Sequence, residues 1–369
     1  MSDAASARAA TEARLERLRA KLEEEELDAI LISSEHNRRY LSGFNGTAGY
    51  LLVSRDDAVV ATDFRYLEQA AVQAPGFQIE RIRARLDWLP RLAAEMGVTV
   101  VGIEADDVTL ALNDRMTEAC NEAANHGARI ELTPTSGITA GLRSVKDEDE
   151  LSVLTRAIEI GDEAFNEVAK SLEPGVTETE VAWRIEISMR ERGAESLGFD
   201  TIVASGANGA RPHHLAAERE LREGEPVVID MGCRYQGYCS DLTRTLFFGE
   251  PDDEFKKIYD VVLMAQLTAI ETVEAGMTGV EADRLARVVI EEAGYGEMFG
   301  HSLGHGVGLE VHERPGIGPN ATGELRDGMV FTVEPGIYLP GRGGVRIEDV
   351  VVLENGRTRV ISHAAKVSP

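Results

Sequence analysis

Cysteine and long apolar runs are both scarce in this chain. Its 369 residues include three cysteines, Cys120, Cys233 and Cys239. An odd and sparse set of this kind excludes a disulfide framework and indicates a reducing compartment, so we predict a cytoplasmic protein. Residues 1–26 contain no apolar run of the kind found in a secretory signal or a membrane-spanning helix, and we expect no membrane association.

Basic residues are scarce as well. The chain has 38 Lys and Arg residues, few of them lysine, against 64 Asp and Glu residues, which gives a formal net charge of -26. Such a chain cannot neutralise phosphates, which argues against nucleic acid and anionic membranes as partners. The acidic side chains are spread along the chain as a solvated coat. With so little lysine, this coat also favours adaptation to high salt, where the repulsion between charges is screened.

The chain is longer than one hydrophobic core usually serves, so two domains are expected. The first, residues 1–140, alternates short apolar runs with segments of helical periodicity, which is typical of an α/β domain. The predicted strands cover residues 28–32, 49–53, 58–61 and 98–103, and predicted helices cover residues 64–73 and 86–96.

Two further segments bound the first domain. An amphipathic helix is predicted at its start, with Leu15, Leu18 and Leu22 on one face. At its end, residues 134–141 are rich in turn formers, and residues 143–150 are predicted to open a long helix. We therefore place the second domain at residues 141–369.

The second domain contains an internal repeat. Residues 173–180 (EPGVTETE) are echoed by residues 274–281 (EAGMTGVE), and in each a Thr-x-x-Glu capping box is predicted to open a helix. Residues 220–230 are echoed by residues 324–334, where a glycine turn leads into a β-rich strand that ends in an acid. Two half-domains related by a pseudo-two-fold axis are expected.

The repeated strands bring acids together in pairs. Asp230 ends the first strand and Asp241 lies on the returning chain, while Glu334 and Glu348 occupy the matching places in the second half. An unpaired carboxylate buried at the end of an apolar strand is costly, so a partner must compensate each of them. For each acid taken singly, that partner could be one of three arginines: Arg244, Arg326 or Arg346.

Three of the eight histidines, His301, His305 and His312, fall within residues 299–312. Four glycines in the same segment disfavour a helix and predict a turn running into a strand, in which His305 is pressed close to a neighbouring segment. Neutral imidazole is the commonest protein ligand for transition metals and the usual proton carrier near neutral pH. The segment is therefore a candidate source of a nitrogen ligand.

Four carboxylates and one imidazole cannot be held together without cations. They suit two divalent ions, which carboxylates can bridge at a separation of about 3.5–4 Å, as in two-metal hydrolases. Oxygen-rich ligation with one nitrogen favours Mn, with Co, Fe or Zn as alternatives, and disfavours a structural zinc site, which would use cysteine. Cys233 and Cys239 lie near the acids in the sequence but are expected to be packed strand residues.

The spacing of the candidate ligands closely resembles that of the pita-bread metallopeptidases, in their aminopeptidase P and prolidase (Xaa-Pro peptidase) branch. Residues 44–53 and 61–69 resemble the creatinase-type N-terminal domain, so the resemblance covers both domains. It implies an α+β fold: a mixed α/β N-terminal domain followed by a pita-bread domain, in which a curved antiparallel sheet with pseudo-two-fold symmetry is covered by helices. The five ligands are Asp230, Asp241, His305, Glu334 and Glu348.

The resemblance implies a role for each ligand. Asp230 binds one metal ion, His305 and Glu334 bind the other, and Asp241 and Glu348 bridge them. A hydroxide held between the ions attacks the scissile carbonyl, because two cations lower the pKa of bound water and stabilise the developing oxyanion. Glu334 then carries the proton to the leaving nitrogen.

The resemblance also implies roles for other side chains of the pocket. The catalytic histidine is assigned to His213, although the sequence alone does not distinguish it from His214. His312 would hydrogen-bond the oxyanion, and His301 would line the pocket for the proline residue or its carbonyl. Arg346 would pair with a ligand carboxylate or, in a dipeptidase, with substrate.

An enzyme of this branch hydrolyses the Xaa-Pro bond at the N-terminus of peptides, as aminopeptidase P does, or in dipeptides, as prolidase does. The implied partner is a peptide with proline in the second position, and the family implies a homodimer. Two alternatives are a creatinase-like hydrolase of a non-peptide C–N bond and a non-catalytic binding module on the pita-bread fold. The complete ligand set disfavours both. The choice between dipeptides and longer peptides stays open.

Overall fold

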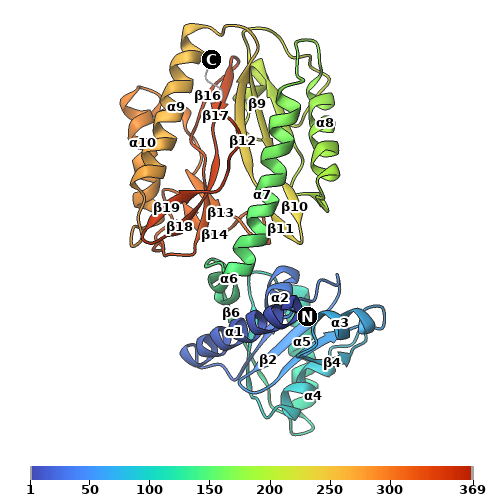
Figure 1. Ribbon diagram of the computed structural model, residues 1–369. Coiled ribbons are helices and arrows are strands. Elements are labelled where there is room, and N and C mark those ends of the chain that lie inside the picture. The colour runs from blue at the N-terminus through green and yellow to red at the C-terminus, as the bar shows by residue number, and fades with distance from the viewer. Residues whose placement is uncertain (1, 367–369) are drawn as a thin grey trace. The chain divides into compact units, whose positions relative to one another are not determined.

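The computed structural model describes residues 2–366, with side chains from residue 8 onward. The chain divides into two compact units, Met1–Arg143 and Ser144–Pro369. The first runs from blue to teal and the second from green to red in Figure 1.

The first unit contains one six-stranded sheet in the order β4-β3-β2-β1-β5-β6. Strand β1 lies inside the sheet, antiparallel to β2 and parallel to β5, and all of its residues are buried. The strands are β1 (Ala29–Ile32), β2 (Tyr50–Ser54), β3 (Ala58–Thr62), β4 (Gln78–Arg81), β5 (Val100–Glu104) and β6 (Glu131–Thr135). The helices are α1 (Ser2–Glu24), α2 (Glu35–Ser42), α3 (Leu67–Gln73), α4 (Trp88–Glu95), α5 (Leu110–Ala124) and α6 (Ile138–Arg143).

The predicted elements of this unit are largely present. The four predicted strands correspond to β1, β2, β3 and β5, and the predicted helices to α3 and α4. Leu15, Leu18 and Leu22 of α1 are 7%, 0% and 3% exposed, which confirms the predicted apolar face. Residues 134–141, which are rich in turn formers, nevertheless include the end of β6 with Pro134 and the start of α6 at Ile138. β6 is an edge strand, where a residue without an N–H group is tolerated.

The second unit places antiparallel strands between two pairs of helices, α7 and α8 on one side and α9 and α10 on the other (Figure 1). The helices are α7 (Glu148–Ala169), α8 (Glu178–Glu191), α9 (Asp253–Thr272) and α10 (Gly279–Glu292), with short 3₁₀ turns η1 (Gly206–Ala210) and η2 (Gly296–Met298). The first-half strands are β7 (Ser196–Leu197), β8 (Ile202–Ser205), β9 (Pro226–Met231), β10 (Cys233–Tyr235), β11 (Tyr238–Cys239) and β12 (Leu242–Phe247). The second-half strands are β13 (Gly304–Gly306), β14 (Glu313–Ile317), β15 (Val330–Val333), β16 (Gly336–Leu339), β17 (Gly343–Arg346), β18 (Asp349–Glu354) and β19 (Arg357–Val360).

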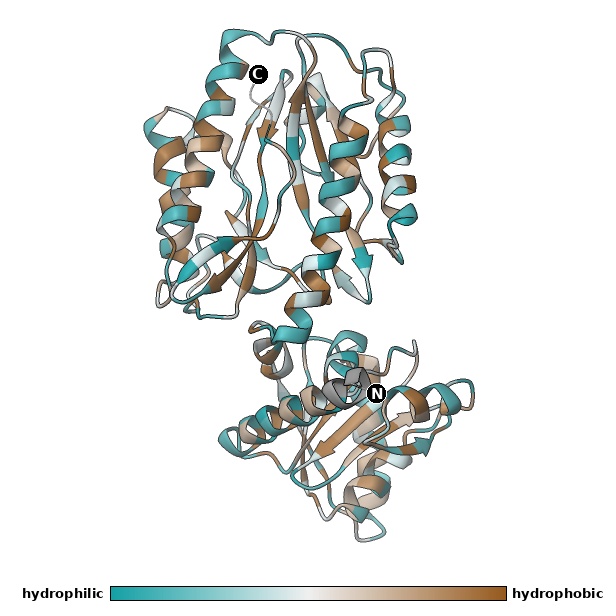
Figure 2. Cartoon of the chain, viewed as in Figure 1, coloured by the Kyte–Doolittle hydropathy of each residue, from teal (hydrophilic) through white to brown (hydrophobic). Residues whose placement is uncertain are grey.

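Each half of the second unit has its own hydrophobic core. In the first half, α7 and α8 pack on β8, β9 and β12, and in the second half α9 and α10 pack on β15, β17 and β18. Brown, hydrophobic segments alternate with teal, hydrophilic ones along these helices, and brown segments also occur in the strands between them (Figure 2). Cys233 and Cys239 are free, buried strand residues, as predicted.

The internal repeat is visible in matching contacts. An isolated bridge joins Thr177 to Glu220 in the first half, and another joins Thr278 to Glu324 in the second. Corresponding residues of the two repeated motifs therefore meet in the same way. This supports the predicted relationship between the half-domains.

The sequence predicts two Thr-x-x-Glu capping boxes, and one of them is complete in the structure. Thr278 and Glu281 bond reciprocally at the start of α10. At the start of α8, Thr177 accepts from the Glu180 N–H, but the Glu180 side chain pairs with Arg184 instead of returning to the cap. The prediction of a full box in the first half is therefore wrong, because an arginine one turn away competes for the glutamate.

No helix within residues 2–366 is both long and apolar enough to span a lipid bilayer.

Candidate metal centre

The first pair of acids is placed by the hairpin of β9 and β12. Asp230 lies opposite Thr243 in the antiparallel register. The chain leaves β9, passes through β10 and β11, and enters β12 directly after Asp241. Both side chains are shielded from solvent, with exposures of 14% for Asp230 and 6% for Asp241.

The second pair is placed in the matching way. Glu334 directly follows β15 and Glu348 directly precedes β18, and these strands pair so that Val333 lies opposite Asp349. Between the two acids, β16 and β17 form a hairpin that ends in Arg346. The acids of each half thus flank a strand pair, as the sequence predicted.

His305 lies on β13, which confirms the predicted turn running into a strand. The glycines around it permit a close approach of backbones: a Cβ on Gly304 would lie 1.9 Å from the Thr332 carbonyl oxygen, and one on Gly306 would lie 2.1 Å from that of Arg314. The His305 N–H donates to Thr332 Oγ1 at 3.0 Å. The strand therefore holds His305 tightly beside β15.

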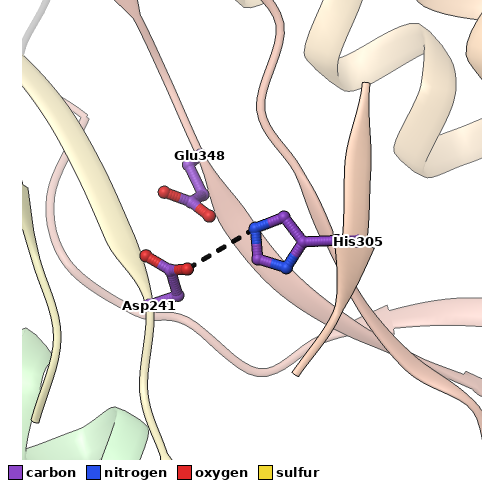
Figure 3. Close-up of side chains that lie close together, drawn as sticks. All are labelled: Asp241, His305 and Glu348. Atoms are coloured by element: carbon purple, nitrogen blue, oxygen red, sulfur yellow. Dashed lines mark ion pairs between the residues drawn. The ribbon is translucent and has the colours of Figure 1, made fainter. Parts of the chain in front are cut away.

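Three of the predicted ligands form a compact cluster. One potential ligand atom from each of Asp241, His305 and Glu348 lies within 4.8 Å of the others. The three side chains point toward a common space, with the imidazole facing the two carboxylates (Figure 3). His305 Nε2 lies 3.7 Å from Asp241 Oδ2 and 3.2 Å from Glu334 Oε1, so Glu334 adjoins the cluster through the imidazole.

Asp230 is engaged differently. It forms an ion pair with Arg346. For this acid, the sequence-based alternative of an arginine as the compensating partner is therefore correct. Arg244 instead pairs with Asp349 at 2.8 Å. Asp230 retains an unused acceptor, because its Oδ1 is buried and has no hydrogen-bond partner among the described residues, and the same is true of Glu348 Oε1.

The electrostatics of the cluster reflect crowded negative charge. Burial and the nearby Glu348 charge raise the pKa of Asp241 well above its ordinary value, and burial followed by the charges of Glu334 and Asp230 does the same for the pKa of Glu348. Burial opposes charge on Glu334 and His305 as well. The hydrogen bond between them and the surrounding opposite charges together outweigh burial, lowering the pKa of Glu334 to about 2 and raising that of His305 to about 9.

These features fit a site for divalent cations. Asp230 Oδ1 and Glu348 Oε1 are buried without a partner in the part of the chain that the structure describes, the acids repel one another, and the donor set is oxygen-rich with one imidazole nitrogen. A cation would satisfy the free acceptors and neutralise the repulsion, and this donor set suits Mn, Co or Fe.

The cluster opens into a cavity of about 730 Å³. His213, His301, His312 and Arg346 all line it, so every residue predicted for catalysis reaches the same space as the ligands. Apolar side chains form other parts of the wall: Phe199, Ile202, Leu215, Val311 and Ile317.

The neighbouring histidines His213 and His214 have different surroundings. His213 is exposed at the cavity, whereas His214 is buried and bonds Glu178 Oε2 through Nε2 at 2.8 Å. The His214 ring is therefore already occupied, which favours His213 as the histidine that faces substrate.

His301 and His312 lie on opposite flanks of His305 in the sequence and both face the cavity. The His312 ring lies 4.1 Å from that of His305, centroid to centroid. Burial, and then the charge of His305, lower the pKa of His312, while burial lowers that of His301. Both are therefore neutral imidazoles near pH 7. The N–H of His301 is on Nδ1 and donates to the Ser302 carbonyl oxygen at 2.8 Å.

Sequence reasoning missed three supporting side chains. The Tyr338 hydroxyl lies 2.9 Å from both His301 Nε2 and Arg346 Nη1. Thr243 Oγ1 donates to Glu348 Oε2 at 2.8 Å. Glu178 holds the segment that contains His214. Strand alternation offered a signal for Thr243, which lies two residues after Asp241. The other two depend on contacts that span many residues.

Two family models match the chain. That of the Creatinase/Prolidase N-terminal domain matches residues 14–145. That of Metallopeptidase family M24 matches residues 152–355, more than half of the chain.

Curated relatives match along nearly their whole length. The uncharacterized peptidase YqhT of Bacillus subtilis is 41% identical over 354 residues, covering 96% of this chain and 98% of the relative. The Xaa-Pro dipeptidase of Pyrococcus horikoshii is 38% identical over 341 residues, covering 92% and 94%.

Solved structures agree. An Xaa-Pro dipeptidase from Bacillus anthracis superposes with a TM-score of 0.92 at 44% identity, covering 97% of this chain and 99% of that one. An X-Pro aminopeptidase from Thermotoga maritima superposes with a TM-score of 0.84 at 39% identity, covering 93% and 97%. These comparisons confirm the α+β fold, with a creatinase-type N-terminal domain and a pita-bread domain.

Proposed function

Because the chain belongs to metallopeptidase family M24, and because its relatives include Xaa-Pro peptidases, we propose that it hydrolyses the bond before a proline in the second position of a peptide. The observation that carries the proposal is the convergence of Asp241, His305 and Glu348 at one point, with Glu334 joined to the imidazole. Few arrangements other than a metal site would hold so many acids together.

Two divalent cations would be held by the five predicted ligands. Asp230 would bind one ion, His305 and Glu334 the other, and Asp241 and Glu348 both, with Mn favoured over Co, Fe or Zn. When bound, the cations supply a water of lowered pKa and polarise the scissile carbonyl.

The remaining chemistry belongs to side chains of the cavity. Glu334, ionised and at the edge of the cluster, accepts a proton and delivers it to the leaving proline nitrogen. His213 and His312 donate N–H groups to the oxygen of the scissile carbonyl, where negative charge develops. Their position on the wall of the same cavity supports these roles.

Arg346 and His301 shape the side of the cavity next to the ligands. Arg346 is committed to Asp230 and Tyr338, which supports a role in orienting a ligand rather than in binding substrate. Tyr338 also fixes the His301 ring, and Ile317 lines the same cavity. This partly apolar lining suits a proline ring.

The test is hydrolysis of matched peptides by the purified protein with added Mn or Co. We expect release of the first residue from Xaa-Pro dipeptides or Xaa-Pro tripeptides, loss of activity with a chelator, and no cleavage when alanine replaces proline. Comparing the dipeptide with the tripeptide distinguishes prolidase-like from aminopeptidase P-like activity. If neither peptide is cut by the metal-loaded protein, the proposal fails, and creatinase-type C–N substrates become the next test.

We further propose a cytoplasmic homodimer. The family resemblance and the three free cysteines support this. Sedimentation at two protein concentrations would measure the oligomeric state, and a monomer throughout would contradict the dimer.

A further inference from the structure

Glu178 is a buried acid that the metal centre does not use. It is the first residue of α8, and it is 0% exposed. Burying a carboxylate is costly unless hydrogen bonds satisfy it. The neighbours of Glu178 therefore indicate what the acid holds.

Within the described residues, every side-chain hydrogen bond of Glu178 goes either to Ser205, at the end of β8, or to residues 206–217, the segment that contains His213. Its Oε1 accepts from Ser205 N at 2.7 Å, Ser205 Oγ at 2.7 Å and Asn208 Nδ2 at 2.9 Å. Its Oε2 bonds His214 Nε2 at 2.8 Å and Ala217 N at 3.1 Å. Burial opposes the charge, but these bonds outweigh it and lower the pKa of Glu178, so the acid is ionised near neutral pH.

The same segment is held on its other side by the second half-domain. A Cβ on Gly344 of β17 would lie 2.2 Å from the Gly209 carbonyl oxygen, so the two backbones touch. Arg346 Nη1 approaches the Pro212 carbonyl oxygen at 3.5 Å. Residues 206–217 are thus fixed between Glu178 and β17, and His213 lies between these supports with its side chain exposed.

The second half-domain holds its own histidine segment from the corresponding helix, but with other chemistry. The position that matches Glu178 is Gly279, where a Cβ would lie 2.2 Å from a backbone oxygen. One turn later, Asp283 accepts from Leu303 N at 3.0 Å and Arg287 donates to the His301 carbonyl oxygen at 2.8 Å. In each half, the helix after the repeated turn anchors a segment that lines the cavity.

We propose that Glu178 is a positioning residue for peptide hydrolysis, which fixes residues 206–217 so that His213 reaches the scissile carbonyl. The inference rests on the proposed function, since it assigns His213 a partner in the substrate. Glu178 itself touches neither the ligands nor the substrate space, so its effect on catalysis passes through His213.

A double-mutant cycle with His213 tests this dependence. Glu178→Gln keeps the shape of the side chain but removes its negative charge. It also replaces one carboxylate oxygen, which accepts hydrogen bonds, by an NH₂ group that faces other hydrogen-bond donors. We expect it to lower kcat by about 10- to 100-fold while KM changes by less than about threefold. In a His213→Ala background, the same change should lower kcat by less than about twofold, because residues that act through one another are not additive.

Amide exchange gives a readout independent of activity. Exchange in residues 206–217 should accelerate by at least about tenfold in Glu178→Gln, while exchange in residues 299–303 stays unchanged. Glu180→Gln, on the same helix and with the same charge change, should alter neither kcat nor exchange. If Glu178→Gln does not fold, His214→Ala removes one of the bonds and goes through the same cycle under the same criteria.

The outcomes separate this inference from the function. Equal losses in the two His213 backgrounds, or unchanged exchange in residues 206–217, would overturn the positioning role. A wild-type protein that cuts no Xaa-Pro peptide would contradict the proposed function. In that case, the amide-exchange measurement alone would decide whether Glu178 fixes residues 206–217.

Discussion

Thr243 Oγ1 donates a 2.8 Å hydrogen bond to Glu348 Oε2 and accepts one from Arg346 Nε at 3.1 Å. This hydroxyl of β12 in the first half therefore orients two side chains of the second half. One of them is a proposed bridging ligand, and the other pairs with Asp230.

Replacing Thr243 by valine should weaken metal binding. The change keeps the shape but leaves Glu348 and Arg346 without the hydroxyl, and partners of this kind typically contribute 10- to 100-fold to metal affinity. We expect a loss of about tenfold in affinity for Mn, measured by calorimetry. Thr243→Ser keeps the hydroxyl and serves as the control. Equal affinity in the valine and serine variants would contradict the role.

Tyr338→Phe should lower activity without disturbing the fold. It removes the hydroxyl that links His301 to Arg346, so both side chains lose a fixed orientation. We expect kcat/KM for an Xaa-Pro peptide to fall by about tenfold. Tyr259→Phe is the matched control, because Tyr259 lies on α9, is also buried, packs against Phe247 of β12 and does not line the cavity. A similar loss in the two variants would argue against a specific role for Tyr338.

Metal removal should lower the melting temperature of the wild-type protein. It should also change the effect of Glu348→Gln on the melting temperature from destabilising to stabilising. Without cations, Glu348 is a buried acid among other acids, so Glu348→Gln should raise the melting temperature of the metal-free protein by a few degrees. With Mn present, the wild type gains stability by binding and the variant gains less. Scanning calorimetry of both proteins, with and without chelator, measures this. A variant less stable than wild type in both conditions would count against the cluster being a cation site.

The stabilising effect of Glu178 should depend on pH. Its pKa in the folded protein is lowered below 4.5, so its ionised form stabilises the fold above that value and the contribution is lost as the pH falls through the folded-state pKa. The difference in melting temperature between wild type and Glu178→Gln should therefore be largest at neutral pH and shrink below about pH 4. For Glu180→Gln the difference should stay small throughout. A difference in melting temperature between wild type and Glu178→Gln that grows at acid pH would contradict this prediction.

The acidic surface predicts tolerance of high salt. With a formal charge of -26, repulsion opposes the compact state, and salt screens it. We expect the melting temperature to rise, and activity to persist, between about 0.1 M and 1 M KCl. Sucrose at matched water activity is the control for general exclusion effects. Loss of activity in molar KCl would refute the prediction.

The candidate ligands could be found from sequence because the repeat marks them twice. A glycine turn, a β-rich strand and a terminal acid recur at Asp230 and Glu334, and the returning strands supply Asp241 and Glu348. The glycines around His305 likewise predicted a strand, since they permit backbones to approach closely. Local pattern and duplication were sufficient here because each signal lies within one hairpin.

The supporting contacts could not be found in this way. The Thr-x-x-Glu pattern draws attention to Glu180, whereas the residue that anchors the histidine segment is its neighbour Glu178, whose partners lie 27 to 39 residues further along the chain. Tyr338 lies 37 residues from His301. No periodicity reports such pairs, because they arise from how segments distant in the sequence pack against one another within each half. The distinction between His213 and His214 has the same origin, since only burial separates two adjacent imidazoles.

The candidate ligands are divided between the halves: Asp230 and Asp241 belong to one, and His305, Glu334 and Glu348 to the other. Neither hairpin alone can form the coordination sphere, and the two must first pair across a long stretch of chain, which is a slow step in folding. A cation held by all five residues would therefore bind late in the folding of this chain. It would not guide the early stages and would bind only chains whose two halves have already packed together.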